Sequence, residues 1–264
     1  MHNLSIFSSH QQVLKRYFSI CFFWFFFQLH AFAQSFDACY EEGLKLESAL
    51  NEKAAYNQYL KAHKIDPSSI KALYKCAELS SRIGIRQSNP QTRLMYYESS
   101  LAYAKLLIKT QPGTQEANLA MAIALGRLAL VKSGKEKIRY VKEIKIYAEK
   151  TVAINPQNFK AWHIIGKWHY EVSNLNFMER TAIKLFFGGI PESSFAAAIQ
   201  AYEKAKSINP FFCSNYLELA MAYNKCNQHS KAVANLKSML ALQDKTEDDA
   251  ILKKQASALL KAWN

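Results

Sequence analysis

Small and apolar residues recur at helical spacing on either side of an apolar insert between residues 159 and 210. Apolar residues three or four positions apart lie on one face of a helix, small residues let a facing helix approach closely, and proline ends a helix. The stretch therefore predicts two antiparallel helices that pack against each other. The positions that define this pattern are Trp162, Ile165, Gly166, Ala198, Tyr202, Ala205 and Pro210.

The same pattern recurs upstream without an insert, and downstream between residues 213 and 244. The upstream positions are Gly43, Ala55, Tyr59, Ala62 and Pro67. A period of about 34 residues with these spacings is typical of the tetratricopeptide repeat. We therefore predict an all-α fold, a tetratricopeptide-like superhelical array of antiparallel helix pairs with about five repeats and a C-terminal capping helix. Within a single domain, residues 34–264, the predicted repeats are 36–69, 70–112, 115–156, 159–210 and 213–244, and the cap is 246–263.

Two repeats depart from the standard length. In the second, we expect a loop containing Gly84 and Pro90 before a returning helix over residues 91–110. In the fourth, about 20 residues beyond the standard period form an insert. Its apolar character favours a short core helix that closes one face of the array, with a mobile lid over a hydrophobic ligand as the alternative. The candidate functional residues of the insert are Phe177, Arg180, Phe186 and Phe187.

The first 33 residues have the build of a secretory signal peptide. A start without acidic residues ends in Lys15 and Arg16, an apolar run follows over residues 17–27, and a small-x-small pattern ends at Ala33. An apolar run of about 11 residues is too short to span about 30 Å of hydrocarbon comfortably. We therefore expect cleavage after Ala33 and export to the periplasm or cell envelope, with a cytoplasmic or organelle-associated protein as the alternative.

The formal net charge of the chain is +13, and loss of residues 1–33 would remove two positive charges and no negative one. A basic surface favours anionic partners such as phospholipid head groups, anionic polysaccharide or an acidic protein. Much of the lysine, however, stands beside glutamate at expected exposed helix positions. A solvated surface with excess lysine is therefore the alternative interpretation.

Four cysteines follow the predicted cleavage position: Cys39, Cys76, Cys213 and Cys226. Cys213 and Cys226 are 13 residues apart in one expected helix, which corresponds to about 20 Å, so they should not pair. Cys39 and Cys76 fall on neighbouring helices, which leaves a disulfide open, although the role of small apolar core residues is favoured. No CxxC occurs, which argues against a zinc knuckle or a thioredoxin-like redox site.

Fixed positions on the first helix of each repeat are expected to face a concave groove. These positions predict an aromatic and basic groove that suits an extended peptide with acidic groups, or a lipid whose head group meets Lys160 and Lys167. Packing of the same residues on the insert is the alternative. A two-carboxylate clamp for chaperone tails is rejected, because it needs Lys and Asn where this chain has Tyr40 and Leu44. The candidate groove residues are Tyr40, Lys71, Tyr74, Lys160, His163, Lys167, Tyr170, Leu217, Met221 and Asn224.

No catalytic or metal-binding motif accompanies the helical pattern. The sequence has no HExxH, no GxxxxGK[ST] phosphate loop and no nucleophile turn. His163 and His169 are six residues apart, which places them on different helix faces and argues against a metal pair. We therefore expect a protein that is not an enzyme and needs no cofactor or metal. A nucleic-acid partner is not expected, because charge alone would support it.

Residues 160–225 carry features beyond the repeat pattern. They combine Ile-Gly-Lys-Trp at residues 165–168, an insert with Phe177 and Arg180, an apolar run that closes in small residues and Pro191, and Asn-Pro-Phe-Phe at residues 209–212. This stretch resembles the regulator of microtubule dynamics family, whose members have a tetratricopeptide-like helical domain. The resemblance extends over residues 36–242 and implies a non-enzymatic helical adaptor whose eukaryotic relatives are linked to microtubules and organelle membranes.

The leading hypothesis is an exported scaffold that binds a protein or peptide, with a carrier of a lipid or other amphipathic ligand as one alternative. A microtubule-associated regulator, as implied by the resemblance, is the other alternative. It requires that the chain is not exported, since tubulin would not be available to an exported protein.

Overall fold

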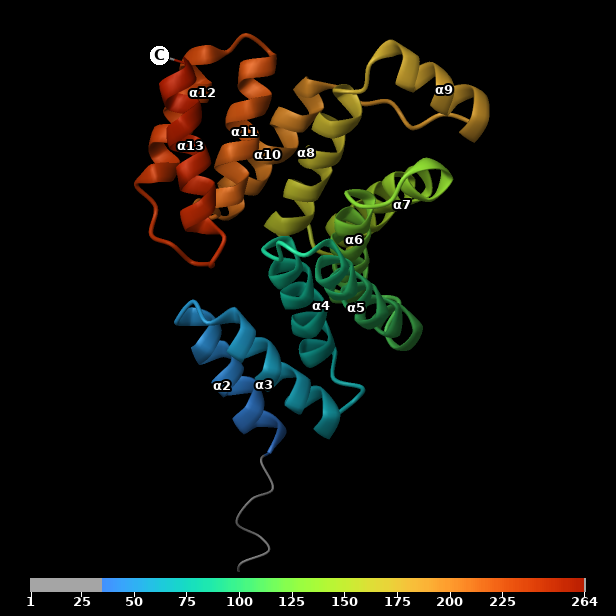
Figure 1. Cartoon of the computed structure of the whole chain (residues 1–264), viewed down its shortest axis with the longest axis vertical. Coiled ribbons are helices and arrows are strands. Elements are labelled where there is room, and N and C mark those ends of the chain that lie inside the picture. The colour runs from blue at the N-terminus through green and yellow to red at the C-terminus, as the bar shows by residue number, and fades with distance from the viewer. Residues whose placement is uncertain (1–34, 264) are drawn as a thin grey trace, which may run out of the picture.

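The computed structural model describes residues 35–263, and this part of the chain forms twelve helices and no strand (Figure 1). The predicted all-α class is therefore confirmed, while the predicted signal peptide, residues 1–33, lies outside the described residues. The helices are α2 (Phe36–Ser48), α3 (Glu52–Ile65), α4 (Ile70–Ile85), α5 (Pro90–Thr110), α6 (Gln115–Ala129), α7 (Gly134–Ile154), α8 (Phe159–Ser173), α9 (Phe177–Phe187), α10 (Phe195–Ile208), α11 (Cys213–Lys225), α12 (His229–Leu240) and α13 (Asp249–Trp263).

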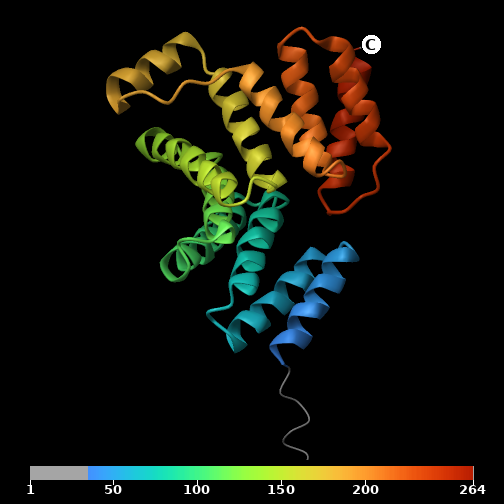
Figure 2. The ribbon, with the colours of Figure 1, turned by 180° about the vertical axis from the view of Figure 1, so that it is seen from behind.

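Most helices pack in pairs with a neighbour along the chain. The pairs are α2 with α3, α4 with α5, α6 with α7, α8 with α10, and α11 with α12, and α13 packs on α11 and α12. First helices also touch across pairs, since α4 contacts α6, α6 contacts α8, and α8 contacts α11. The pairs follow a curved path that brings the first pair and the last helices to the same side of the array (Figures 1 and 2). We call the side on which the first helices meet the inner face.

Short polar side chains cap eight of the twelve helices of residues 35–263. A side chain at the N-cap accepts a hydrogen bond from the backbone N–H three residues later, which satisfies a donor that the helix itself leaves free. Because such caps are local, the sequence sets these helix starts without help from tertiary packing. The residues that cap in this way are Ser35, Asn51, Ser69, Asn89, Thr114, Asn158, Asn176 and Ser194.

A tyrosine ring lies flat on the backbone of the facing helix in two of the pairs. A Cβ atom built on Gly166 would lie 2.6 Å from the Tyr202 ring, and one on Gly43 would lie 2.5 Å from the Tyr59 ring. Both rings are fully buried. Since any side chain at the glycine would collide with the ring, the predicted close approach at Gly166 is confirmed.

The second repeat uses the same contact at a position that the sequence analysis placed in a loop. Gly84 lies inside α4, and a Cβ atom there would be 2.7 Å from the Tyr97 ring. The predicted loop is therefore wrong at this residue. Helix α4 continues to Ile85, because packing of the Tyr97 ring on Gly84 stabilises its last turn. The chain then turns at Asn89, which caps α5, and Pro90 occupies the first turn, where a missing N–H costs no hydrogen bond.

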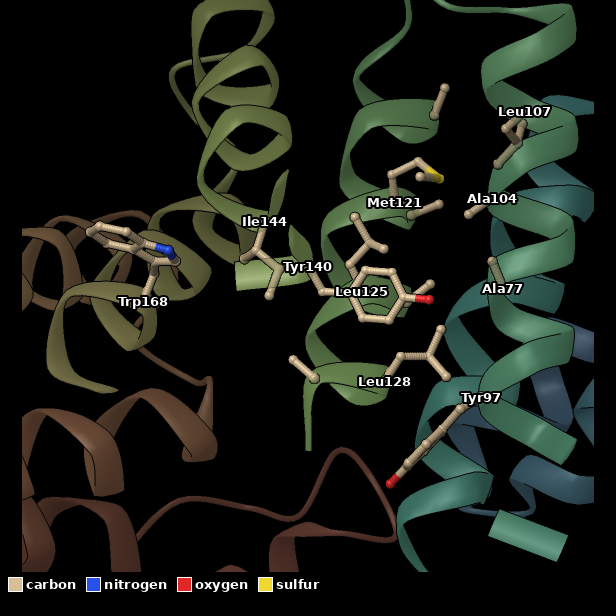
Figure 3. Packing of buried hydrophobic residues seen from close by; sticks show 14 of the residues in the cluster. Ala77, Tyr97, Ala104, Leu107, Met121, Leu125, Leu128, Tyr140, Ile144 and Trp168 are labelled. Atoms are coloured by element: carbon tan, nitrogen blue, oxygen red, sulfur yellow. The ribbon is translucent and has the colours of Figure 1, made fainter. Parts of the chain in front are cut away.

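Helix α6 forms the centre of the largest core (Figure 3). It packs between α5 and α7 and also reaches α4 and α8. Leu125 and Leu128 are 1% exposed and meet the buried rings of Tyr97 and Tyr140. At the edge of this core, Trp168 donates a hydrogen bond to the Val141 carbonyl at 2.7 Å, which joins α8 to α7.

The insert forms α9, but it is not the core helix that its apolar composition predicts. None of its residues is buried, and Phe177 is 82% exposed. The helix projects from the array beside α7 (Figures 1 and 2). The prediction is wrong because α9 is held by its caps and by the hydrogen bonds of Arg180 to Val172 and of Lys142 to Phe187, which leave its other sides outside the core. Among residues 35–263, no helix has both the length and the apolar character needed to cross a membrane.

All four cysteines of the described chain are free thiols. Cys39 and Cys76 are each fully buried and belong to separate core clusters, so the disulfide left open by the sequence does not form. Burial raises the pKa of the Cys76 thiol to about 12. These two side chains are small apolar core residues, as the sequence analysis favoured.

The contact between glycine and tyrosine predicts opposite effects for two glycine replacements. Gly166→Ala should lower the free energy of unfolding by about 1–3 kcal/mol, since the ring of Tyr202 must move. Gly126→Ala, in α6, meets no atom within 4 Å and should raise it by about 0.5–1 kcal/mol, because alanine restricts the unfolded chain. Urea denaturation measures both. Equal effects of the two changes would contradict this account of the packing.

Candidate functional site

Ion pairs cross the inner face between helices of different repeats. Lys160, on α8, contacts the Glu78 carboxylate on α4, and its Nζ atom lies 3.4 Å from the Tyr74 hydroxyl. Burial opposes ionisation of Glu78, but the cations around it, Lys160 foremost, lower its pKa to about 2. The expected positive charge at Lys160 is therefore neutralised by a carboxylate 82 residues away in the sequence.

Lys167 is paired in the same way. Its Nζ atom lies 2.7 Å from Glu218 on α11 and 3.1 Å from Glu171 on its own helix. Burial would lower the pKa of Lys167, yet the two carboxylates raise it. The basic groove predicted from Lys160 and Lys167 is thus a row of ion pairs, because the acidic partners stand on neighbouring helices that the sequence alone does not align.

The side chain of His163 is buried behind the inner face and is not exposed on it. Its Nδ1 atom is 3.1 Å from Asn215 Oδ1, and the Asn215 amide donates to the Tyr202 carbonyl at 2.8 Å. Since the Asn215 amide nitrogen is already the donor to Tyr202, Asn215 Oδ1 is the acceptor, and it accepts a hydrogen bond from the Nδ1–H of His163. Burial lowers the pKa of His163 to about 4. The neutral imidazole therefore connects α8 to α11 through Asn215, whose amide in turn binds α10.

The two ends of the array meet in a cluster that we call the clasp, made of Glu52, Arg82, Arg86, Glu247 and Asp248. Arg86 lies 2.7 Å from Glu52 and 2.7 Å from Asp248, and Arg82 also contacts Glu52. The Glu52 N–H donates to Glu247 at 2.6 Å, and the Glu247 N–H donates back to Glu52 at 3.1 Å. Glu52 is fully buried. The clasp joins residues 195 positions apart.

Arg127, on α6, differs from the other cations of the inner face. Its Nε–H donates to Ser81 Oγ at 3.0 Å, but no carboxylate of residues 35–263 lies within ion-pair distance of its guanidinium. Residues 1–34 contain no Asp or Glu. Burial lowers the pKa of Arg127, and the charges that act on it include Asp248, Glu218 and Arg82, which surround the same space from three other elements.

Sequence reasoning missed Arg127 because the groove positions were counted from repeat anchors, and the third repeat matches those anchors poorly. A different signal was present. Arg127 is the one charged residue between Ala117 and Val131, in an otherwise apolar or uncharged helix. A lone charge on a buried helix is costly unless a partner compensates it, so such a residue marks a position to examine.

The remaining predicted groove residues do not form one surface. Lys71 Nζ lies 4.5 Å above the Tyr40 ring and 3.6 Å from Asp37, near the N-terminal end of the array. At the other end, Tyr170 and Leu217 are buried in the core, Met221 packs against the same core, and Asn224 lies 3.4 Å from His229. Buried side chains cannot meet a partner without unfolding, so only the exposed members remain candidates.

The predicted residues of the insert lie apart from the inner face. Phe177 and Phe186 are exposed, and Phe187 is half-buried against α7. The Arg180 guanidinium donates to the Val172 carbonyl at 2.7 Å and so ties α9 to the end of α8. The insert therefore forms a separate surface.

Comparison with known proteins identifies both a family and a fold. Residues 33–264 match the family model described as "Regulator of microtubule dynamics protein 1-3". The chain is 27% identical to Regulator of microtubule dynamics protein 1 of Mus musculus over 66% of this chain and 57% of that protein. It is 22% identical to Regulator of microtubule dynamics protein 3 of Mus musculus over 83% of this chain and 44% of that protein. The chain thus spans about half the length of these relatives.

Among solved structures, a thermophilic TPR protein from Thermus thermophilus superimposes with a TM-score of 0.61. The two chains are 16% identical, and the match covers 85% of this chain and all of that one. This likeness shows the fold alone. It confirms that the helical array is of the tetratricopeptide type.

The neutral state of His163 predicts an acid-sensitive fold. Its folded pKa of about 4 lies below its ordinary value of 6.5, so the unfolded state binds the proton first and stability falls as pH drops from 6.5 towards 4. For one proton, the free energy of unfolding changes by at most about 1.4 kcal/mol per pH unit. His163→Gln should flatten the profile of unfolding free energy between pH 6.5 and 4.5, above the range in which Glu78 titrates.

Urea denaturation at a series of pH values measures this effect. The half-buried residues His63 and His169, whose pKa values burial also lowers, are present in both proteins and cancel in the difference. Parallel profiles for the parent and His163→Gln would show that His163 does not carry the effect.

Proposed function

Because the chain belongs to the regulator of microtubule dynamics family, we propose that it is a helical scaffold that binds a protein partner at its inner face. This premise agrees with the resemblance found in residues 160–225. The tetratricopeptide-type array supports a role in protein interaction, and within this proposal the chain has no catalytic task. The activities of the longer relatives enter here only as proposals, since this chain covers about half of their length.

The observation that carries the proposal is that no carboxylate of residues 35–263 lies within ion-pair distance of Arg127. A guanidinium that has lost much of its water and lacks a carboxylate is unfavourable, and an anionic group from a partner would offset that cost. The side chain is partly accessible, and its guanidinium still has donors that Ser81 does not use. We therefore propose that an acidic segment of the partner places a carboxylate against Arg127.

The lysines that the sequence analysis favoured have a different role in this proposal. Lys160 and Lys167 already hold Glu78, which is buried, and Glu218, which is half-buried, so a partner would have to displace one of these carboxylates to reach either lysine. Their ion pairs fix the spacing of α4, α8 and α11 around the space that Arg127 faces. A carrier for a whole lipid tail is not favoured, because charged pairs cross this face where a carrier needs apolar lining.

A second candidate is a role in regulating microtubules, favoured by the names of the relatives. It depends on where the protein resides. The basic and apolar start of residues 1–33 supports the proposal that the chain is exported after cleavage at Ala33. An exported protein would meet partners of the cell envelope and not tubulin, so location separates the two candidates.

Replacement of Arg127 tests the first candidate. With a fluorescent glutamate-rich peptide as the probe, Arg127→Gln should bind about tenfold to a hundredfold more weakly, since a hydrogen bond to a charged group contributes about 1.5–3 kcal/mol. Removal of an unpaired charge should leave the free energy of unfolding unchanged or higher. Lys45→Gln is the control, because Lys45 is an exposed cation on α2, away from the inner face and from α9. Equal affinity of the parent and Arg127→Gln for the glutamate-rich peptide would contradict the proposal.

The second candidate predicts that the protein sediments with stabilised microtubules and that added salt weakens this binding, as expected for a basic protein on an acidic surface. N-terminal sequencing of the protein purified from its own host supplies the deciding observation. A chain that retains residues 1–33 and pellets with microtubules supports this role. A chain that starts after Ala33 in an envelope fraction excludes it.

A further inference from the structure

One face of α9 presents large apolar side chains to solvent. Phe177, Met178, Leu185 and Phe186 are 73–82% exposed, and we call these four residues the apolar stripe. Their positions repeat at helical spacing, with Thr181 and Ala182 on the same face between them. Single exposed apolar residues are ordinary on a protein surface, whereas four on one short helix form a patch that marks an interaction site.

The exposure of the apolar stripe follows from how α9 is held. At its start, Asn176 and Glu179 form a reciprocal capping box, and at its end Gly188 takes a left-handed conformation with φ of 70°. The opposite face carries Ile183 and Phe187, which are half-buried, and Lys142 on α7 donates to the Phe187 carbonyl at 2.7 Å. The helix is thus fixed by its ends and its inward face. Phe177, Met178 and Leu185 are left exposed to solvent, and Phe186 is exposed at the edge of the groove against α7.

Several cations lie on α9 and on the adjacent part of α7. Lys135, Arg139 and Lys142 on α7 line the same groove as Phe186 and Phe187. Lys184 and Arg180 add two more positive charges on α9 itself. The nearby carboxylates are engaged. Glu179 caps its own helix, Glu136 lies 3.9 Å from both Lys132 and Arg139, and Glu143 lies 4.0 Å from Arg139. We call Lys135, Arg139, Lys142 and Lys184 the basic rim.

We propose that the apolar stripe and the basic rim dock the protein on the surface of a membrane that contains anionic lipids. The stripe would enter the boundary between head groups and acyl chains, while the rim pairs with lipid phosphates. An apolar helix face flanked by lysine and arginine is the arrangement that this boundary favours, because the two forces act at the same depth.

A membrane fits this surface better than a protein partner does. Helix α9 is about 16 Å long and projects as a ridge. A stable protein interface buries about 1,000 Å² or more with a matching groove, which a short ridge alone does not supply. A bilayer accepts a ridge without a preformed groove. The surface also lies apart from Arg127 and the clasp, so the inner face stays open to a partner when the protein is docked.

Vesicle sedimentation of the full chain tests the proposal. The parent should bind vesicles of phosphatidylcholine mixed with phosphatidylglycerol at least tenfold more strongly than vesicles of phosphatidylcholine alone. Phe177→Ser with Leu185→Ser should reduce binding to the mixed vesicles at least tenfold. Lys135→Glu with Lys184→Glu should remove the preference for the anionic lipid. All of these residues are exposed or at the surface of α7 and α9, so the variants should keep the parent's thermal unfolding temperature.

The matched control is Phe211→Ser, which removes a ring that is 61% exposed in the loop between α10 and α11. It should bind like the parent. Every variant retains residues 1–34, so binding through that segment would be common to all and would cancel in the comparison. Equal binding of the parent and the Phe177→Ser, Leu185→Ser variant overturns the proposal, as does a loss of binding in the control alone.

Discussion

The close approach of paired helices is the constraint on which the rest of this structure depends. A tyrosine ring packs against the backbone at Gly43, Gly84 and Gly166, so in these three pairs the two helices lie as close together as one ring allows. That contact fixes the rotation of the first helix and turns its polar positions to the inner face. The ion pair between Lys160 of α8 and Glu78 of α4 is therefore a consequence of packing elsewhere in their two pairs.

The inner face shows why a basic composition is a poor guide to a basic surface. Lys160 and Lys167 are neutralised by carboxylates on other helices, and Lys75 is held in the same way by Glu47 at 2.8 Å. Within residues 35–263, Arg127 donates only to the hydroxyl oxygen of Ser81. A cation without a carboxylate within ion-pair distance is therefore more informative about a partner than the total number of lysines, because these lysines already pair with carboxylates of the same chain.

Local features of this fold could be predicted from the sequence, and long-range features could not. The capping residues and the glycine at position 166 identify helices and their pairing because both act within one repeat. The partner of Lys160 lies two repeats away, so no spacing rule gives it. The insert was misjudged for a different reason. Apolar composition predicts that a segment will be covered, but it does not say whether the same chain covers it, and α9 is held by its caps and by its inward face against α7.

The clasp changes how the array should respond to stress. In an open array of repeats, each unit senses only its neighbours, and unfolding can begin at either end. Here Glu52 and Glu247 exchange hydrogen bonds across the two ends, so neither terminal repeat is free to fray without breaking a buried contact with the other. Closure of this kind turns a one-dimensional chain of units into a single cooperative body. Unfolding of one terminal repeat should therefore destabilise the other directly, through the lost hydrogen bonds between Glu52 and Glu247, and not only through the repeats between them.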